Sequence, residues 1–169
     1  GYLPWELSLY PSMTGSGFLQ LMANVNGAQI DNTFLTDLFD RLQFDPSRKM
    51  SQYSRCNKQQ VCLIAAFMAK PDLLLLDEPT GGLDPLIQQT VMEMVKEVKE
   101  DGRTVFFSSH ILSEVEAVCD RVGIIREGEL IQTSTVQALT KQAFKRLRLT
   151  LKEAPAADTF NSISEVTEV

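Results

Sequence analysis

The chain has 169 residues, 44% of them hydrophobic and 22% charged, a composition typical of a globular protein large enough to bury a core. Its net charge of −6, without any basic stripe, argues against a nucleic-acid partner held through neutralised phosphates. The three cysteines form no CxxC pair, which predicts neither a zinc site nor a disulfide framework and favours a reducing, cytosolic compartment.

Hydrophobic periodicity and turn residues predict alternating helices and strands along the chain. The strand over Leu73–Asp77 is apolar throughout and is expected to be buried on both faces, and Thr104–Ser108 is a second apolar strand. In chain order we expect a short strand and loop over Gly1–Thr14, a helix opened by Gly15-Ser16-Gly17, helices over Thr33–Leu42 and Ser54–Ala69 (capped by Ser54), the strand Leu73–Asp77, a helix over Ile87–Glu100, the strand Thr104–Ser108, a helix over Ile111–Cys119, a hairpin of Val122–Arg126 and Leu130–Thr133, a helix over Thr135–Ala143 and an exposed strand over Leu147–Leu151.

The most informative stretch is Leu73–Asp84, which reads LLLLDEPTGGLD. A buried strand that ends in Asp77-Glu78 places two carboxylates at the carboxyl edge of a sheet, where open α/β sheets bind their ligands. Asp77 is placed to hold a metal ion through its water shell, and Glu78 to polarise an attacking water. These residues contain no GxxxxGK[ST] phosphate loop.

The second apolar strand ends in Ser108-Ser109-His110, and His110 is the only histidine of the chain. A lone histidine after an apolar strand is more often structural than catalytic. Here it follows a strand that should end at the same edge of a parallel sheet as Asp77-Glu78, so the sequence favours a functional histidine.

Taken together, these motifs resemble the nucleotide-binding domain of an ABC transporter, over Gly1–Leu139. The match is closest to bacterial exporter-type domains with a YSRGN signature. The segments that carry the resemblance are GYLPWELSLYPSMT for the Q-loop region, YSRCNKQ for the signature, LLLLDEPTGGLD for the Walker B motif and D-loop, VFFSSH for the strand before the switch histidine, and DRVGIIREGELIQTST for the strand pair that follows.

The resemblance implies ATP and Mg²⁺ as cofactors and assigns roles to individual residues. Asp77 would contact the Mg²⁺ shell, Glu78 would be the general base for the water that attacks the γ-phosphate, and His110 would hold that phosphate and the water in line. The remaining positions would serve the nucleotide across a dimer: Ser54, Arg55, Cys56 and Asn57 of the signature toward the partner's γ-phosphate, and Asp84 of the D-loop toward the partner subunit.

For the fold, the resemblance implies an α/β class, with a mostly parallel P-loop NTPase (RecA-like) core sheet and an α-helical subdomain, in a fragment truncated at its N-terminal end. The implied segments are 1–70 for the Q-loop region, helical subdomain and signature helix, 71–144 for the α/β core, and 145–169 for the start of an accessory module. The implied function is the ATP-binding subunit of a transporter at the cytoplasmic face of a bacterial-type membrane. Its partners would be transmembrane permease subunits and a second nucleotide-binding domain, in a homo- or heterodimer.

Two positions depart from the family pattern. Trp5 stands where the family usually has the Q-loop glutamine, and we expect it to be an exposed interface aromatic. Cys56 replaces the second signature glycine, where its side chain would crowd the phosphate. A thiol at a helix N-terminus would also ionise more easily, which would repel phosphate.

Two alternative functions stay open. One is a non-transport ATPase with the same motifs, although such relatives tend to carry long coiled-coil or basic insertions. The other is a degenerate, non-hydrolytic interaction domain, favoured by the missing phosphate loop and by Cys56, and opposed by Asp77, Glu78 and His110. We expect the fragment alone to be inactive and the parent protein to be an ATPase.

Overall fold

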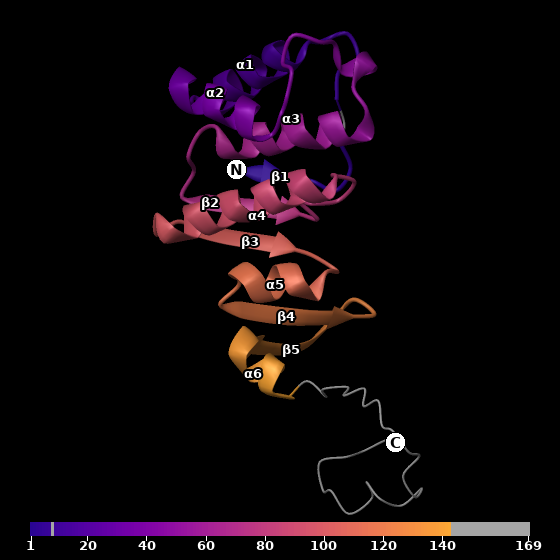
Figure 1. Cartoon of the computed structure of the whole chain (residues 1–169), viewed down its shortest axis with the longest axis vertical. Helices are drawn as coiled ribbons and strands as arrows, with labels where there is room; N and C mark the ends of the chain where they lie inside the picture. The colour runs from indigo at the N-terminus through magenta and orange to yellow at the C-terminus, as the bar shows by residue number, and fades with distance from the viewer. Residues whose placement is uncertain (8, 143–169) are drawn as a thin grey trace, which may run out of the picture. The chain divides into compact units, whose positions relative to one another are not determined.

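The structure, a computed structural model, describes residues 1–7 and 9–142 and divides into a compact unit, Gly1–Val136, and a second unit that begins at Gln137. The expected elements are present with their ends within two residues of the predicted ones, and the predicted strand Leu147–Leu151 and segment 145–169 lie outside the described residues. The elements are β1 (Tyr2–Leu3), α1 (Gly15–Asn26), α2 (Asn32–Arg41), the 3-10 helix η1 (Met50–Gln52), α3 (Arg55–Phe67), β2 (Leu73–Asp77), α4 (Pro85–Glu100), β3 (Thr104–Ser108), α5 (Leu112–Val118), β4 (Arg121–Arg126), β5 (Glu129–Thr135) and α6 (Val136–Gln142) (Figure 1).

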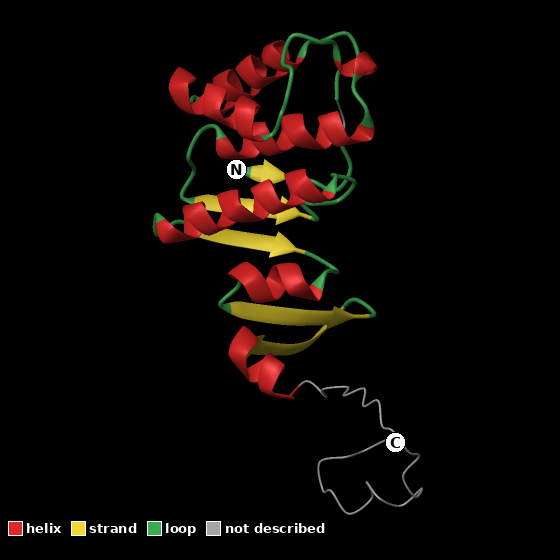
Figure 2. Cartoon of the chain, in the orientation of Figure 1, coloured by secondary structure: helices red, strands yellow, loops and turns green. Residues whose placement is uncertain are grey.

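Three parallel strands form the central sheet, in the order β1-β2-β3 (Figure 2). The register pairs Tyr2 with Leu75 and Leu75 with Phe106, and it places Asp77 opposite Ser108. Because the strands are parallel, β2 and β3 end at the same edge, as the sequence predicted. This edge brings the two polar strand ends together.

One apolar core lies between the sheet and the helices. Helix α3 is buried along most of its length: Val61, Ile64 and Met68, which follows its last turn, have almost no exposure, whereas Ala65 is only partly buried. The other large side chains with almost no exposure come from several elements and loops: Leu3, Leu19, Leu38, Leu42, Met50, Leu63, Phe67, Leu74 and Met94. Burial of this apolar surface is the main force that holds the sheet against the helices.

The prediction that β2 is buried on both faces is wrong. Leu74 and Leu76 are buried in the core, but Leu73 and Leu75 are 46% and 39% exposed, and Phe106 on the neighbouring strand is 70% exposed. Side chains alternate between the two faces of a strand, so these three lie on the face opposite the core. Among the described residues, α3 contacts β1 and α4 contacts β3, and these three side chains stay exposed. Strand composition alone does not reveal which faces receive a covering layer.

Local sequence signals explain where the helices begin and end. Asp84 caps α4, because its Oδ1 accepts the backbone N–H groups of Leu86 and Ile87 at 3.1 Å each, and Pro85 occupies the first turn. Thr14 caps α1 by accepting the N–H of Gly17 at 3.1 Å, so the Gly15-Ser16-Gly17 stretch is a helix start, as predicted.

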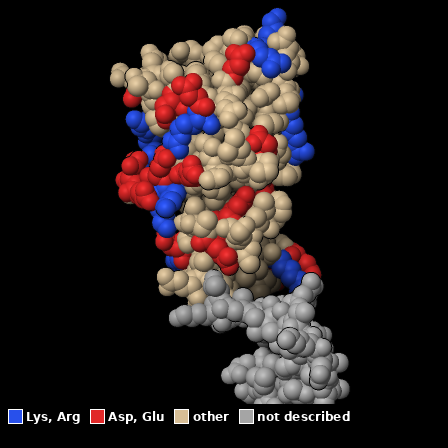
Figure 3. Space-filling view, viewed as in Figure 1, with Lys and Arg blue, Asp and Glu red and all other residues tan. Residues whose placement is uncertain are grey.

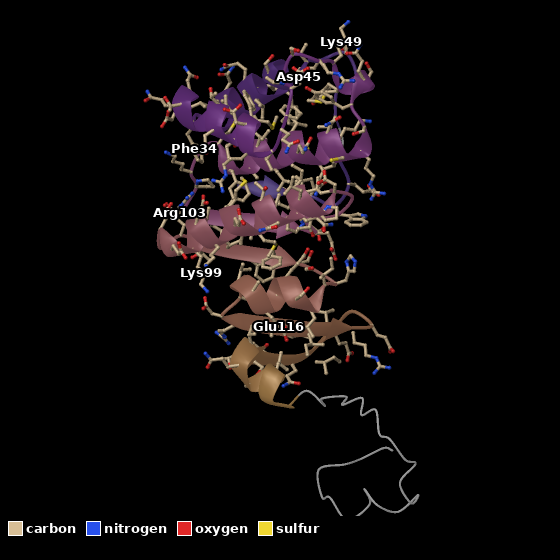
Figure 4. All side chains as sticks on the ribbon, viewed as in Figure 1. Phe34, Asp45, Lys49, Lys99, Arg103 and Glu116 are labelled. Carbon is tan, nitrogen blue, oxygen red and sulfur yellow. The ribbon has the colours of Figure 1, made fainter. Side chains whose placement is uncertain are left out.

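Cation contacts tie neighbouring elements together. The Lys70 ammonium after α3 lies 4.4 Å from the ring centroid of Phe34, a residue of α2 that Figure 4 labels. Lys99, also labelled in Figure 4, donates from α4 to the Val118 carbonyl at 3.0 Å and to Asp120 at 2.7 Å. These contacts connect α2 with the chain before β2, and α4 with the end of α5.

The predicted hairpin is confirmed in β4 and β5, which pair antiparallel. Glu127 and Gly128 at the tip both have positive φ, 54° and 81°, which matches a two-residue type I′ turn. Among the described residues, no helix is both long and apolar enough to span a membrane. On the face shown in Figure 3, acidic side chains are interspersed with basic ones.

Candidate functional site

The carboxyl edge of the sheet holds Asp77, Glu78 and Ser108 in direct contact. The Ser108 hydroxyl donates to Asp77 Oδ1 at 2.6 Å and accepts the backbone N–H of Glu78 at 2.9 Å. One hydroxyl from β3 therefore fixes a carboxylate and the next peptide on β2. The sequence placed these strand ends at one edge but gave Ser108 no role, because the register of two distant strands is not visible in the sequence.

The backbone of Glu78 is held in an uncommon conformation. Its φ is +47°, in the left-handed region that non-glycine residues seldom occupy and that costs about 1–3 kcal/mol where the surroundings enforce it. Strain of this kind concentrates at functional sites. The side chain of Glu78 is only 18% exposed, and its Oε2 lies 2.9 Å from Nδ1 of His110.

His110 and Glu78 form a hydrogen-bonded pair although they lie 32 positions apart in the chain. Helix α4 and strand β3 lie between them in the sequence. The hydrogen bond to Glu78 is the main cause that raises the pKa of His110 above its ordinary value, followed by the Coulombic attraction of the same carboxylate and a smaller one from Glu114. The ring itself is exposed, with 74% of its side chain accessible. A carboxylate beside an accessible imidazole can accept a proton from water and share it with a hydrogen-bonded neighbour.

The turn between β2 and α4 is anchored from two helices. Thr80 is buried, and its carbonyl accepts Gln88 Nε2 of α4 at 3.2 Å. The carbonyl of Glu78 accepts Gln59 Nε2 of α3 at 3.3 Å. The structure gives Asp84 a clear role as the helix cap of α4, and its predicted contact with a partner subunit stays a prediction.

The signature segment forms the N-terminal turn of α3. Ser54 is the cap, as predicted, because its Oγ accepts the Asn57 N–H at 3.2 Å, and the same hydroxyl lies 3.0 Å from Asn57 Oδ1. Burial raises the pKa of the Cys56 thiol. The expectation that this thiol would ionise more easily is therefore wrong, since loss of solvent outweighs the hydrogen bond that it makes with the backbone of Asp84.

A cavity of about 260 Å³ lies beside Glu78, and Trp5 forms one wall of it. The Arg55 guanidinium lies 6.0 Å from the centroid of the Trp5 ring, a cation–π contact between the first loop and the signature helix. Trp5 is 53% exposed, as expected, but it also borders the site. The remaining lining residues are Leu7, Lys58, Gln59 and Gly81.

The oxygen donors at this edge fit a hard divalent cation whose coordination shell is completed by phosphates and water. Within the described part of the chain, no three His, Cys, Asp or Glu side chains gather into a metal site. Mg²⁺ is commonly held by one or two carboxylates together with phosphates and water, and Asp77, oriented by Ser108, offers such a carboxylate.

Comparison with known proteins gives the same result for family and fold. A model of the family described as "AAA domain, putative AbiEii toxin, Type IV TA system" matches residues 10–116, more than half of the chain. An uncharacterized ABC transporter ATP-binding protein of Nostoc is 37% identical over 145 residues, which are 82% of this chain and 43% of that protein. The linearmycin resistance ATP-binding protein of Bacillus subtilis is 35% identical over 143 residues, which are 80% of this chain and 45% of that protein.

Solved structures agree. The ATP-binding subunit of an ABC transporter superposes with a TM-score of 0.75 at 29% identity, over 83% of this chain and 60% of that one. A dimeric ATP-binding cassette in a post-hydrolysis state, bound to ADP and Pi, has a TM-score of 0.68 at 19% identity, over 80% of this chain and 62% of that one, and supports the fold alone.

The chain spans less than half the length of these curated relatives. Its fold is that of P-loop ATPase cassettes, as the sequence predicted. Family model, relatives and structures together show that the chain belongs to the family of ABC transporter ATP-binding domains.

Proposed function

We propose that these residues form the hydrolytic part of an ATP-binding subunit that couples ATP hydrolysis to the transport of a solute across a membrane. The observation that carries the proposal is the arrangement at the sheet edge: Asp77 ends β2, Glu78 follows it directly, and His110 Nδ1 lies 2.9 Å from Glu78 Oε2. Three groups suited to phosphoryl transfer thus lie at or just after the ends of two adjacent parallel strands.

In this proposal Glu78 acts as the general base. Its carboxylate is partly shielded, at 18% exposure, and its backbone is fixed by hydrogen bonds at both the N–H and the carbonyl. A carboxylate held in this way can orient a water molecule and accept its proton. His110, bonded to the same carboxylate and open to solvent, would stabilise the charge of the phosphoryl group and keep the water in line.

Asp77 would hold Mg²⁺ through its water shell, because Ser108 occupies Oδ1 and fixes the orientation of the carboxylate. Bound Mg²⁺ neutralises the charge that develops on the phosphates of ATP. These 169 residues contain no GxxxxGK[ST] loop to cradle the β- and γ-phosphates. We therefore expect the 169-residue chain by itself to show no turnover, and the complete protein to supply the loop.

The proposed partners are transmembrane permease subunits and a second nucleotide-binding domain, at the cytoplasmic face of the membrane. Support comes from relatives named for transport, among them the bacitracin transport ATP-binding protein of Enterococcus faecalis, 33% identical over 136 residues. One solved cassette of the same fold is dimeric, and the proposal extends its second domain to this protein. In a dimer, Ser54, Arg55, Cys56 and Asn57 at the N-terminus of α3 would face the partner's γ-phosphate, because helix N-termini attract anions.

The test is Glu78→Gln in the complete protein. The change keeps the shape of the side chain and removes its basicity, so Mg²⁺-dependent turnover should vanish while ATP still binds. The matched control is Glu116→Gln, which makes the same change at an exposed carboxylate on α5 (Figure 4). Near wild-type hydrolysis by Glu78→Gln would show that Glu78 is not the base.

A further inference from the structure

Gln59 is a buried amide that reaches from α3 to the carbonyls that follow β2. The residue is only 7% exposed, and its Nε2 lies 3.3 Å from the carbonyl oxygen of Glu78 and 3.3 Å from that of Pro79. A buried glutamine must satisfy its polar atoms. This one does so on the carbonyl of the proposed base, Glu78, and on that of the next residue, Pro79.

The bonded peptide is the strained one. Glu78 has a φ of +47°, and the Gly81 N–H also donates to its carbonyl, at 3.0 Å. The Gly81 bond belongs to the turn itself, whereas the Gln59 bonds come from another element. Gln59 therefore fixes the left-handed backbone of Glu78 relative to α3, and with it the direction of the carboxylate that contacts His110.

We propose that Gln59 is a positioning residue that couples the signature helix α3 to the general base Glu78 within one subunit. This inference rests on the proposed function, which assigns hydrolysis to Glu78 and phosphate contact to the N-terminus of α3. Ser54 lies five residues before Gln59, about 7.5 Å along a helix axis. A shift of α3 on binding phosphate would thus move the backbone at Glu78 through the two hydrogen bonds that the Gln59 side chain donates.

The next residue, Gln60, offers a matched control. It is equally buried, at 3% exposure, and its Nε2 donates to the carbonyl of Leu42 at 2.7 Å. Gln60 therefore makes the same kind of buried bond from the same helix, but to the helical subdomain. Replacing either glutamine with methionine keeps an unbranched side chain of similar size and removes the amide.

The experiment compares Gln59→Met, Gln60→Met and Glu78→Gln in the complete protein. We measure thermal stability, kcat and KM for ATP. For Gln59→Met we expect kcat to fall about 10- to 100-fold, the range that a misplacement of about 1 Å produces, with KM within about twofold of wild type. Gln60→Met should lose a similar amount of stability and keep kcat within about threefold.

A second readout does not depend on turnover. The ring signals of His110, assigned by their loss in His110→Asn, report its pKa by NMR without nucleotide. Glu78 raises this pKa more than Glu114 does, so Gln59→Met should lower it toward the ordinary value and Gln60→Met should not. Gln59→Asn, which keeps the amide but shortens its reach, should shift the pKa in the same direction.

The outcomes separate the two proposals. If Glu78→Gln retains turnover, the proposed function fails whatever Gln59 does. If Glu78→Gln is inactive while Gln59→Met matches Gln60→Met in kcat and in the His110 titration, the coupling role is overturned. The same conclusion follows if neither Gln59 variant folds and Gln60→Met does, because Gln59 would then be a structural residue only.

Discussion

Replacing Ser108 with alanine removes one hydroxyl that serves both Asp77 and Glu78. The bond from the Glu78 N–H is between neutral groups and contributes about 1 kcal/mol, and the bond to the Asp77 carboxylate is charge-assisted and contributes about 1.5–3 kcal/mol. Both lie at an exposed edge where water replaces part of the loss. We expect the free energy of unfolding to fall by about 1–2 kcal/mol.

The same change should weaken the metal site, because the hydroxyl orients the Asp77 carboxylate. Loss of a group that orients a metal ligand typically lowers metal affinity about 10- to 100-fold. The assay is the Mg²⁺ concentration for half-maximal turnover of the complete protein, with urea unfolding in parallel. Ser108→Thr, which keeps a hydroxyl, should restore most of both.

Ser109 provides the control, because its hydroxyl makes the same two kinds of bond elsewhere. It donates to Glu114 Oε2 at 2.6 Å and accepts the Ile111 N–H at 3.0 Å. Ser109→Ala should therefore lower stability to a similar extent and leave the Mg²⁺ requirement unchanged. An unchanged Mg²⁺ requirement in Ser108→Ala, or an equal shift in Ser109→Ala, would refute the reasoning.

Three further predictions concern other contacts. Because Glu78 raises the pKa of His110, the pair stabilises the fold fully below the ordinary pKa of 6.5, and this stabilisation is lost as pH rises through the raised pKa. The free energy of unfolding of His110→Ala, measured in urea, should therefore depend less on pH in that window. Turnover of His110→Ala should also fall about 100-fold or more, and an unchanged rate would argue against a transition-state contact. Cys56→Gly should raise turnover or ATP-driven dimerisation by removing bulk from the N-terminus of α3, and no effect on either would show that this residue does not face the nucleotide. Arg41 binds Glu97 through two hydrogen bonds of 2.7 Å, so a double-mutant cycle of urea unfolding should give a coupling free energy of about 0.5–1 kcal/mol. A coupling free energy near zero would contradict this prediction.

The sequence by itself determined the local structure and which polar side chains lie at the sheet edge. Helical periodicity, caps such as Ser54 and the turn at Glu127-Gly128 act within a few residues, so their signals predicted the elements closely. The apolar run that ends in Asp77-Glu78 predicted carboxylates at a sheet edge, because this signal also lies within a few residues. The ends of two parallel strands must meet at one edge, which also brought His110 into the prediction.

Only the tertiary structure decided what depends on residues far apart in the chain. The Ser108 hydroxyl meets Asp77 through a register set by packing, and Gln59 reaches Glu78 from another helix. Burial set the direction of the pKa shift of Cys56. Leu75 is exposed although its strand is apolar, because in the described part of the chain its face of the sheet carries no covering layer. Solvent exposure and register are properties of the assembled layers, which no local pattern specifies.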